Sequence, residues 1–294
     1  MKFVVAVTNN RWFEFLRRQT FDEANFWSPG TASVNLDVGT PWLFKLHAPL
    51  NYVVGGGYFT YRTTLPLRVA WDTFGQENGA VDSLEFQDRI GKMHARDVIG
   101  CTVLSEPFFW DESQWLPPPP GWSQNIVSYK ANDTASADVA EYWSLVARQL
   151  PRTALTAPDV STAYGKPMIR LSRLGQGEFR SRIIDAYGRR CAVTGERTLP
   201  ALEAAHIVPF SEIKGHDIRN GVLLRADLHR LFDDGYVTIN PEHRFEVSKH
   251  IKDDYENGRD YYALHGRSIA LPADPRLIPA SEYLTEHATH IYRG

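Results

Sequence analysis

The sequence predicts a protein of the α+β class that folds as two domains. Its 294 residues exceed the length of one typical domain, and a hydrophobic content of 43% is enough for packed cores. Aromatic residues, β-forming residues and turn-forming glycines are frequent in the first half, and helical spacing appears near residue 140 and again after residue 175. We therefore predict domains at 1–150 and 175–294, joined by a linker at 151–174.

The first domain is predicted to be rich in strands and to end in a helix. VVGGGYFTYRT at 53–63 is typical of a strand entered through a glycine turn, and DVIGCTVLSEPFFW at 97–110 is typical of a strand that leads into a loop. Residues 135–150 carry apolar side chains at helical spacing, and Pro151 prevents easy continuation of that helix. The stretch 151–174 has three prolines and no clean period, which is why we assign it as the linker.

Composition excludes several classes of protein. The two cysteines, Cys101 and Cys191, are too few for a disulfide framework or a four-cysteine zinc site, and they fit a reducing cytosol. No apolar run reaches transmembrane length, and the N-terminus lacks the long apolar region of a signal peptide. We therefore expect a cytoplasmic protein that does not act at a membrane.

Charge is distributed unevenly along the chain. The net charge of −3 at pH 7 is unusual for a protein that binds nucleic acid. However, residues 1–150 contain 12 Lys or Arg and 16 Asp or Glu, whereas residues 166–230 contain 12 Lys or Arg and 7 Asp or Glu. The basic excess therefore lies mostly in the second domain.

The second domain is predicted to open with a helix near Gly177, which ends at Gly188. A short strand follows in ALEAAHIVP at 201–209. NGVLL at 220–224 begins with Asn-Gly, a strong turn signal, and continues as a second strand. ADLHRLFDDG at 226–235 then predicts a short helix that ends at a glycine.

The order of these elements resembles the HNH endonuclease family, whose fold is the ββα-metal motif. His206, Asn220 and His229 supply the three letters at intervals of 14 and 9 residues, and the resemblance covers about 175–240. The preceding RLGQGEFRSRII and CAVTG are similar to one restriction-associated branch of that family. The resemblance implies hydrolysis of phosphodiester bonds in DNA.

The resemblance also implies a role for each polar side chain. His206 is the expected general base, because an imidazole titrates near the operating pH and accepts the proton of the attacking water. His229 is expected to hold one divalent cation, Mg²⁺ or Mn²⁺, at the scissile phosphate. Asn220 is expected to brace the loop and orient His206. Asp233 shares a helix face with His229 and matches a further ligand position, and Arg180 is a candidate phosphate contact.

The sequence departs from the family pattern at Ala205, where many members place a metal-binding Asp or His. Glu203 lies two residues earlier on the same strand, so its side chain points to the same side and replaces the missing ligand, unless Asp233 does so. An oxygen-rich ligand set with one imidazole suits Mg²⁺ or Mn²⁺ better than zinc. We expect no structural zinc, because CAVTG has one cysteine where the family's zinc knuckles need a pair.

The first half resembles the EVE-like branch of the PUA superfamily in NFWSPG, GTPWLFKLHAPLNYVVGGGYF, AWDTFGQENGA and IGCTVL, over roughly 1–130. The resemblance implies a curved β-barrel with helices that holds one modified base, swung out of the duplex, in an aromatic pocket. Several proteins of this type are fused to HNH domains in modification-dependent restriction enzymes. The expected partner is therefore double-stranded DNA that carries a modified base, with 5-methyl- or 5-hydroxymethylcytosine first and N6-methyladenine second.

Two groups of side chains are candidates for this recognition. The expected walls and polar contacts of the base pocket are Trp12, Trp27, Asn10, Asn25 and Ser28. The expected phosphate contacts of this domain are Lys45 and Arg62.

The sequence leaves three alternatives open. The chain is an HNH nuclease without modification dependence, a non-catalytic sensor of modified nucleic acid with a degraded HNH domain, or an RNA-binding protein of the PUA type. Ala205 favours the sensor, whereas the retained His206, Asn220 and His229 favour a nuclease. A single HNH centre cuts one strand, so cleavage of both strands is expected to need either a homodimer or two successive cutting events.

Overall fold

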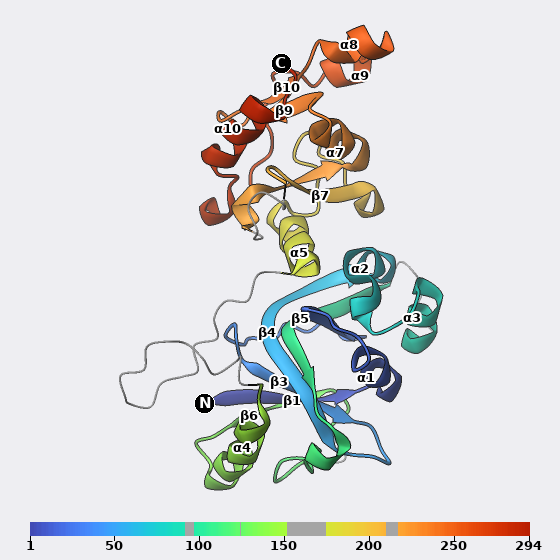
Figure 1. Ribbon diagram of the computed structural model, residues 1–294, viewed down its shortest axis with the longest axis vertical. Helices are drawn as coiled ribbons and strands as arrows, with labels where there is room; N and C mark the ends of the chain where they lie inside the picture. The colour runs from blue at the N-terminus through green and yellow to red at the C-terminus, as the bar shows by residue number, and fades with distance from the viewer. Residues whose placement is uncertain (92–96, 124, 152–174, 210–216) are drawn as a thin grey trace. The chain divides into compact units, whose positions relative to one another are not determined.

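A computed structural model of the protein describes residues 1–91, 97–123, 125–151, 175–209 and 217–294. The chain divides into two compact units, Met1–Gly177 and Glu178–Gly294, which Figure 1 colours from blue to green and from yellow to red. Beyond Pro151, the predicted linker lies outside the described residues. None of the helices in the described part of the chain is long and apolar enough to cross a membrane.

The first unit is built on strands, as predicted. Its strands are β1 (Lys2–Thr8), β2 (Glu23–Ser28), β3 (Pro41–Leu46), β4 (Val53–Pro66), β5 (Val98–Phe109) and β6 (Tyr129–Asp133). Its helices are α1 (Asn10–Leu16), α2 (Leu67–Phe74), α3 (Ser83–Ile90) and α4 (Ala137–Gln149), with 3-10 turns η1 (Gly75–Asn78) and η2 (Glu112–Gln114). The strands predicted at 53–63 and 97–110 and the helix predicted at 135–150 are confirmed as β4, β5 and α4.

The six strands form one curved sheet in the order β2-β5-β4-β3-β1-β6. β1 and β3 are parallel, whereas the other neighbours are antiparallel. The register shifts at two places between β4 and β5 and at one between β3 and β4, and such bulges bend a sheet. The two long strands curve visibly in Figure 1. The expected barrel is not closed, because pairing among the described strands stops at β2 on one edge and at β6 on the other.

Strand periodicity fills both faces of this sheet. Val4 and Ala6 belong to an apolar cluster that α1 covers with Phe13 and Leu16. The alternate residues of β1 belong to a second cluster that contains Tyr142 and Val146 of α4. Because both faces of β3 are covered, all six of its residues are buried.

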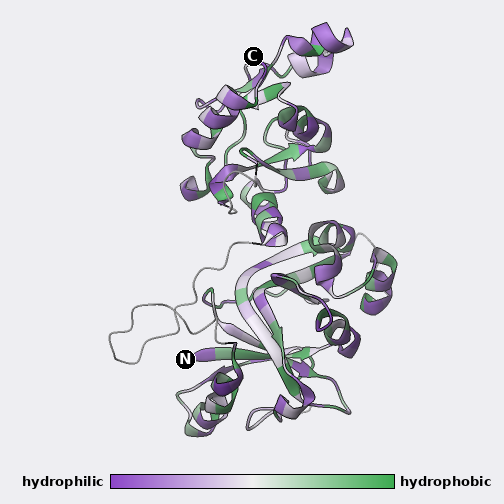
Figure 2. Ribbon diagram, viewed as in Figure 1, coloured by the Kyte–Doolittle hydropathy of each residue, from purple (hydrophilic) through white to green (hydrophobic). Residues whose placement is uncertain are grey.

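The second unit contains the predicted ββα arrangement. Its helices are α5 (Gln176–Ala186), α7 (Ala226–Asp233), α8 (His250–Tyr255), α9 (Arg259–Tyr262) and α10 (Ser281–His290). Its strands are β7 (Leu202–His206), β8 (Gly221–Arg225), β9 (Val237–Ile239) and β10 (Phe245–Val247), with 3-10 turns η4 (Leu199–Ala201), η5 (Ile218–Asn220) and η6 (Pro275–Leu277). β7 and β8 form one antiparallel pair, β9 and β10 form another, and α7 follows β8 without a gap. In Figure 2 the ribbon of the β7–β8 hairpin carries apolar residues, whereas the ribbon of α8 is mostly hydrophilic.

Candidate active site

The ββα segment brings Glu203, His229 and Asp233 together. Leu228 and Phe232 bury one face of α7, and His229 projects from the adjoining part of the helix toward β7. Nδ1 of His229 lies 2.7 Å from Oε2 of Glu203, and its Nε2 lies 3.4 Å from Oδ2 of Asp233. One imidazole ring is therefore flanked by a carboxylate at each nitrogen.

The electrostatics of this cluster are those of a site with excess negative charge. Burial raises the pKa of Asp233; the neighbouring His229 opposes this, and the charges of Asp234 and Glu203 add to it. The side chains of His229, Glu203 and Asp233 retain 21%, 40% and 58% of their solvent exposure. A ligand from solvent therefore reaches the cluster, and a cation there would offset the two carboxylates.

The donor set fits a hard divalent cation in its chemistry, because two carboxylates and one imidazole are ligands of Mg²⁺ and Mn²⁺. In the structure the two carboxylates contact the imidazole ring rather than surround an open point. Within the described residues, no group of three or more His, Cys, Asp or Glu is already arranged to hold a metal ion. Cation binding therefore requires at least one of these contacts to give way.

Asn220 is the anchor of the loop that follows His206. Its side chain is fully buried and binds both backbone polar groups of Val208, because Oδ1 accepts from the amide of Val208 at 2.8 Å and Nδ2 donates to the carbonyl of Val208 at 2.9 Å. The amide of Ile207 also donates to the carbonyl of Asn220. The bracing role predicted for Asn220 has this structural basis.

His206 is the last residue of β7, where it pairs with Gly221 of β8. Its imidazole stacks on the ring of Phe179 from α5, with ring centroids 4.1 Å apart and ring planes inclined by 6°. Strand alternation directs Glu203 and His206 to different faces of β7. Glu203 accordingly contacts α7, whereas His206 lies against α5. The sequence predicted the helix that carries Phe179 but gave no sign of this contact.

A second candidate site lies within the first unit, in a cavity of about 520 Å³. Three of the five residues predicted for a base pocket line it, namely Trp12, Trp27 and Ser28. Aromatic side chains that also line it are Phe26, Trp42 and Tyr129. A volume of this size is typical of small-molecule sites, so the cavity has room for a nucleobase with a substituent.

The other two predicted pocket residues serve the fold instead. Asn25 is fully buried, and its Nδ2 donates to Oδ1 of Asn78 at 2.8 Å. Asn10 accepts a hydrogen bond from the amide of His47 and does not line the cavity. Trp12 is 2% exposed and belongs mainly to the core, whereas Trp27 is half-buried.

The three residues predicted to contact phosphate lie in different environments. Lys45 is 4% exposed, and its Nζ donates to the carbonyl of Leu46 and to Oδ1 of Asn51, each at 2.9 Å. The Lys45 amine is therefore engaged within the first unit, and its proposed phosphate contact stays a prediction. Arg180 is half-buried on α5, where its proposed phosphate contact stays a prediction. Arg62 lines the cavity.

Arg62 joins three strands and the loop beyond them. Its Nη1 donates to Thr102 of β5 at 2.6 Å, and its Nη2 donates to Ser28 of β2 and to the carbonyls of Gly30 and Ala32. The guanidinium lies over Gly100, where an added Cβ would approach Nη2 to 2.1 Å. Burial lowers the pKa of Arg62. Arg62 therefore holds the cavity rim, a role that its sequence position did not reveal.

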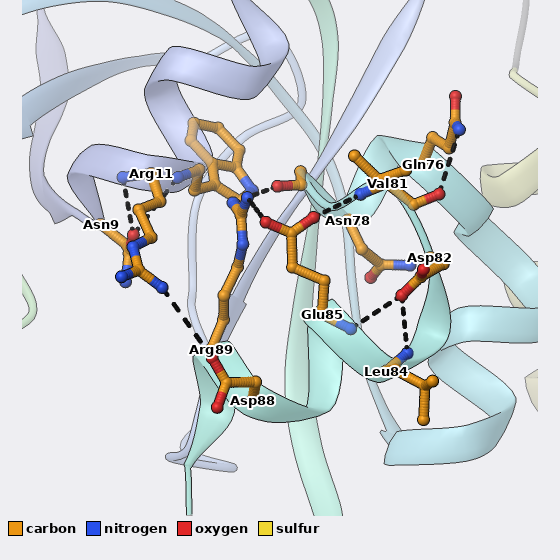
Figure 3. A network of polar contacts seen from close by, with 12 residues as sticks. Asn9, Arg11, Gln76, Asn78, Val81, Asp82, Leu84, Glu85, Asp88 and Arg89 are labelled. Carbon is orange, nitrogen blue, oxygen red and sulfur yellow. Dashed lines mark hydrogen bonds and ion pairs between the residues drawn. The ribbon is translucent and has the colours of Figure 1, made fainter.

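Sequence reasoning missed Arg89 and His47, which also line the cavity. Arg89 is held by Glu85 at 2.6 Å, one helical turn earlier on α3, and by the carbonyl of Gly79 (Figure 3). Burial, with the charge of Lys45, lowers the pKa of His47. The described cavity lining contains no Asp or Glu, so its side chains favour a neutral or acceptor-rich ligand.

Figure 3 also shows the hydrogen bonds that hold the start of α3, the helix beside the cavity. Asp82 caps α3 by accepting from the amides of Leu84 and Glu85. Asn9, which lines the cavity, caps α1 in the same way. The cavity is thus bordered by two capped helices.

Comparison with known proteins supports the assignment of the second unit. Residues 191–240 match the profile of a family described as HNH endonuclease. Among solved structures, the chain is similar to ASCH from Zymomonas mobilis, with 12% identity and a TM-score of 0.35 over 48% of this chain and 94% of that one. It is also similar to the modification-dependent TagI restriction endonuclease, with 12% identity and a TM-score of 0.30 over 98% of this chain and 81% of that one.

No curated protein sequence matches the chain. The family match spans the CAVTG segment, both strands of the hairpin and α7, and includes His206, Asn220 and His229. The HNH resemblance predicted over 175–240 is therefore confirmed for residues 191–240, the span that the HNH endonuclease family model matches.

Proposed function

We propose that the protein is a modification-dependent DNA endonuclease. The observation that carries the nuclease part is the pairing of His229 with Glu203 and Asp233 beside a strand that ends in His206. The observation that favours modification dependence is the cavity in the first unit, which is lined by aromatic side chains and bordered by Arg62 and Arg89. DNA with a modified base is the proposed substrate.

His206 acts as the general base in this proposal. It takes a proton from a water molecule that attacks the phosphorus, and the water oxygen forms the new bond as the 3′ oxygen leaves. Asn220 keeps the backbone after His206 in place through its two hydrogen bonds to Val208. The imidazole thus meets the phosphate in one orientation, which is the main requirement for proton transfer from a positioned water.

Glu203, His229 and Asp233 are the proposed ligands of one divalent cation, Mg²⁺ or Mn²⁺. When bound, the cation supplies charge stabilisation at the phosphate oxygens. Glu203 occupies the side of β7 on which Ala205 has no donor, so it takes the place of the ligand missing there. Asp233 is one helical turn from His229 and contributes a second oxygen ligand.

The first unit selects the substrate in this proposal. A modified base that leaves the duplex enters the cavity, where aromatic faces replace part of the stacking that it loses. Among the aromatic side chains of the lining, Tyr129 is exposed and Phe26 and Trp27 are half-buried, so these three are available for such contact. A 5-methyl- or 5-hydroxymethylcytosine is the first substrate to test, and N6-methyladenine is the second.

Cleavage of matched DNA duplexes tests the proposal. The duplexes contain 5-methylcytosine, 5-hydroxymethylcytosine, N6-methyladenine or no modification, and each is incubated with Mg²⁺, Mn²⁺ or a chelator. We expect metal-dependent cleavage of at least one modified duplex and little of the plain one. His206→Ala should lower the cleavage rate by a factor of roughly 10² to 10⁴, the usual contribution of a general base.

The matched control is His290→Ala, which removes an exposed histidine of the same unit that pairs with Glu286. It should cleave like the wild type. Equal cleavage of plain and modified DNA would contradict the modification dependence and leave an unselective HNH nuclease. Tight binding of modified DNA with no cleavage under any metal condition would instead favour a non-catalytic sensor, the candidate that Ala205 supports.

A further inference from the structure

The contact between His206 and Phe179 is closer than ordinary core packing. The two ring centroids are 4.1 Å apart and the rings are nearly parallel, so one whole face of the imidazole is covered by a phenyl ring. Phe179 is 1% exposed, which leaves it no freedom to turn away. The ring of His206 therefore lies against α5, nearly parallel to the ring of Phe179.

Gly221 makes this approach possible. It pairs with His206 in the hairpin, and an added Cβ at this position would lie 2.8 Å from Cζ of Phe179 and 2.4 Å from Cδ1 of Ile183. Its backbone is extended, with φ −133° and ψ 146°, a conformation that any residue adopts. Glycine is thus required at 221 for space, because α5 sits directly on the hairpin beside the histidine.

The stack has two consequences for a general base. It fixes rotation of the imidazole about its bond to the Cβ atom, so the ring nitrogens point along the plane that Phe179 defines. It also presents the negative face of an aromatic ring to the imidazole, which stabilises the imidazolium that forms when the base accepts a proton. An aliphatic residue in place of Phe179 would provide neither effect.

We propose that Phe179 is a positioning residue for the reaction, which orients His206 and favours its protonated form through the ring stack. The inference rests on the proposed function, because it assigns Phe179 a role only through His206 as the base. Phe179 itself touches neither DNA nor water in this role. Its contribution should appear in the rate and in its dependence on pH, and not in the affinity for DNA.

The test uses Phe179→Leu. Leucine keeps an apolar side chain but has no ring face to stack on the imidazole. Phe179→Leu should lower kcat by about tenfold to a hundredfold, with an unchanged Kd for the modified duplex. The acidic limb of its kcat profile should move to lower pH, because the imidazolium loses a stabilising contact.

Ile183→Val is the matched control. Ile183 lies on the same helix, is equally buried and also packs against Gly221, but it belongs to no ring stack with His206. A purely structural role for α5 predicts that Ile183→Val and Phe179→Leu reduce activity in proportion to their loss of thermal stability. A positioning role predicts that only Phe179→Leu alters the pH profile.

A measurement on the wild type keeps the proposal open to test if Phe179→Leu does not fold. The ring current of Phe179 should displace the imidazole proton resonances of His206 to high field in an NMR spectrum. Resonances at unperturbed positions would overturn the inference. So would a Phe179→Leu enzyme with the wild-type rate and pH profile. Undiminished cleavage by His206→Ala would overturn the role of His206 as the base. This outcome distinguishes failure of the proposed base from failure of the positioning role of Phe179 alone.

Discussion

Glu203 and His229 are 26 residues apart in the chain, yet Oε2 of the first lies 2.7 Å from Nδ1 of the second. This contact joins β7 to α7 on the side of the hairpin where Ala205 carries no donor. In the proposed metal site, Glu203 would either ligate the cation itself or orient the histidine that does. Both roles would make metal affinity depend on Glu203.

Glu203→Gln should therefore raise the concentration of Mg²⁺ or Mn²⁺ needed for half-maximal cleavage by roughly tenfold or more. The amide keeps the shape of the side chain and removes its charge. Glu286→Gln is the control, since Glu286 forms a comparable contact of 2.9 Å with His290 on α10. A metal titration that is the same for Glu203→Gln and the wild type would exclude Glu203 from the metal site.

Trp27 and Trp12 both line the cavity but should respond differently to substitution. Trp27→Ala should reduce the preference for modified over plain DNA, because base stacking on an aromatic ring is worth about 1–3 kcal/mol. Trp12→Ala should instead destabilise the first unit by about 3–5 kcal/mol, because its side chain is buried in the core. Duplex binding and thermal melting of each variant separate the two effects.

A suitable control for both is Trp110→Ala. This tryptophan is 5% exposed, lies in the other apolar cluster and does not line the cavity. It should lower stability without changing the ratio of affinities for modified and plain DNA. If Trp27→Ala kept the wild-type ratio, Trp27 would be assigned to the fold rather than to base recognition.

The guanidinium of Arg62 packs directly on Gly100, so substitutions at these two positions should have coupled effects on stability and binding. Gly100→Ala should displace the guanidinium and the carbonyl of Gly30, and it should cost about 1–3 kcal/mol of stability as an overpacked site. Arg62→Lys removes the planar guanidinium that holds the carbonyls of Gly30 and Ala32 at the cavity rim. This change should weaken the preference for modified over plain DNA. Because both changes release the same contact, the double variant should lose less than the sum of the two losses. Additive losses, measured by denaturation and by duplex binding, would contradict a direct contact between Arg62 and Gly100.

His287 predicts a pH dependence of the second unit's stability. It is 1% exposed; Nε2 donates to the carbonyl of Phe232 at 3.1 Å, so Nδ1 accepts from Thr238 at 2.9 Å and the ring is neutral. Burial lowers its pKa from 6.5 to about 4. In the unfolded chain His287 therefore binds a proton as the pH falls below 6.5, whereas in the folded chain it does so only near pH 4.

The stabilisation is fully present above pH 6.5 and is lost as the pH falls toward 4. The loss should amount to about 3 kcal/mol for this group. His287→Gln retains hydrogen-bonding groups but does not titrate, so its free energy of unfolding should fall less over the same pH range. Identical slopes for wild type and variant in denaturant titrations would assign the acid sensitivity to other groups.

The ββα segment was predictable because its determinants are local. A helix period in 226–235, a turn before residue 221 and a short apolar strand at 201–209 each depend on neighbours in the chain. The turn was inferred from Asn-Gly, yet Gly221 has an extended backbone and Asn220 ends a 3-10 turn. The predicted start of the second strand at this point was right, but Gly221 is needed because it leaves space for α5 and not because it forms a turn.

Side chains whose role depends on tertiary contacts were less predictable. Lys45 and Asn25 are polar residues in strands, where polarity usually indicates an exposed face. Both are buried because the sheet is covered on both sides, and each finds its hydrogen-bond partner on another segment. Arg62 and Phe179 have partners 30 or more and 27 positions away, respectively, and no local pattern specifies such pairs.

The packing of α5 against Gly221 would make the geometry of the proposed general base sensitive to displacement of that helix. α5 follows the predicted linker in the sequence, and Phe179 lies in its first turn. A shift of this helix by a fraction of its own width would unstack the imidazole without altering any residue of the HNH signature. In the proposed mechanism, cleavage therefore depends on an element outside residues 191–240, and those residues alone would lack the alignment that α5 provides.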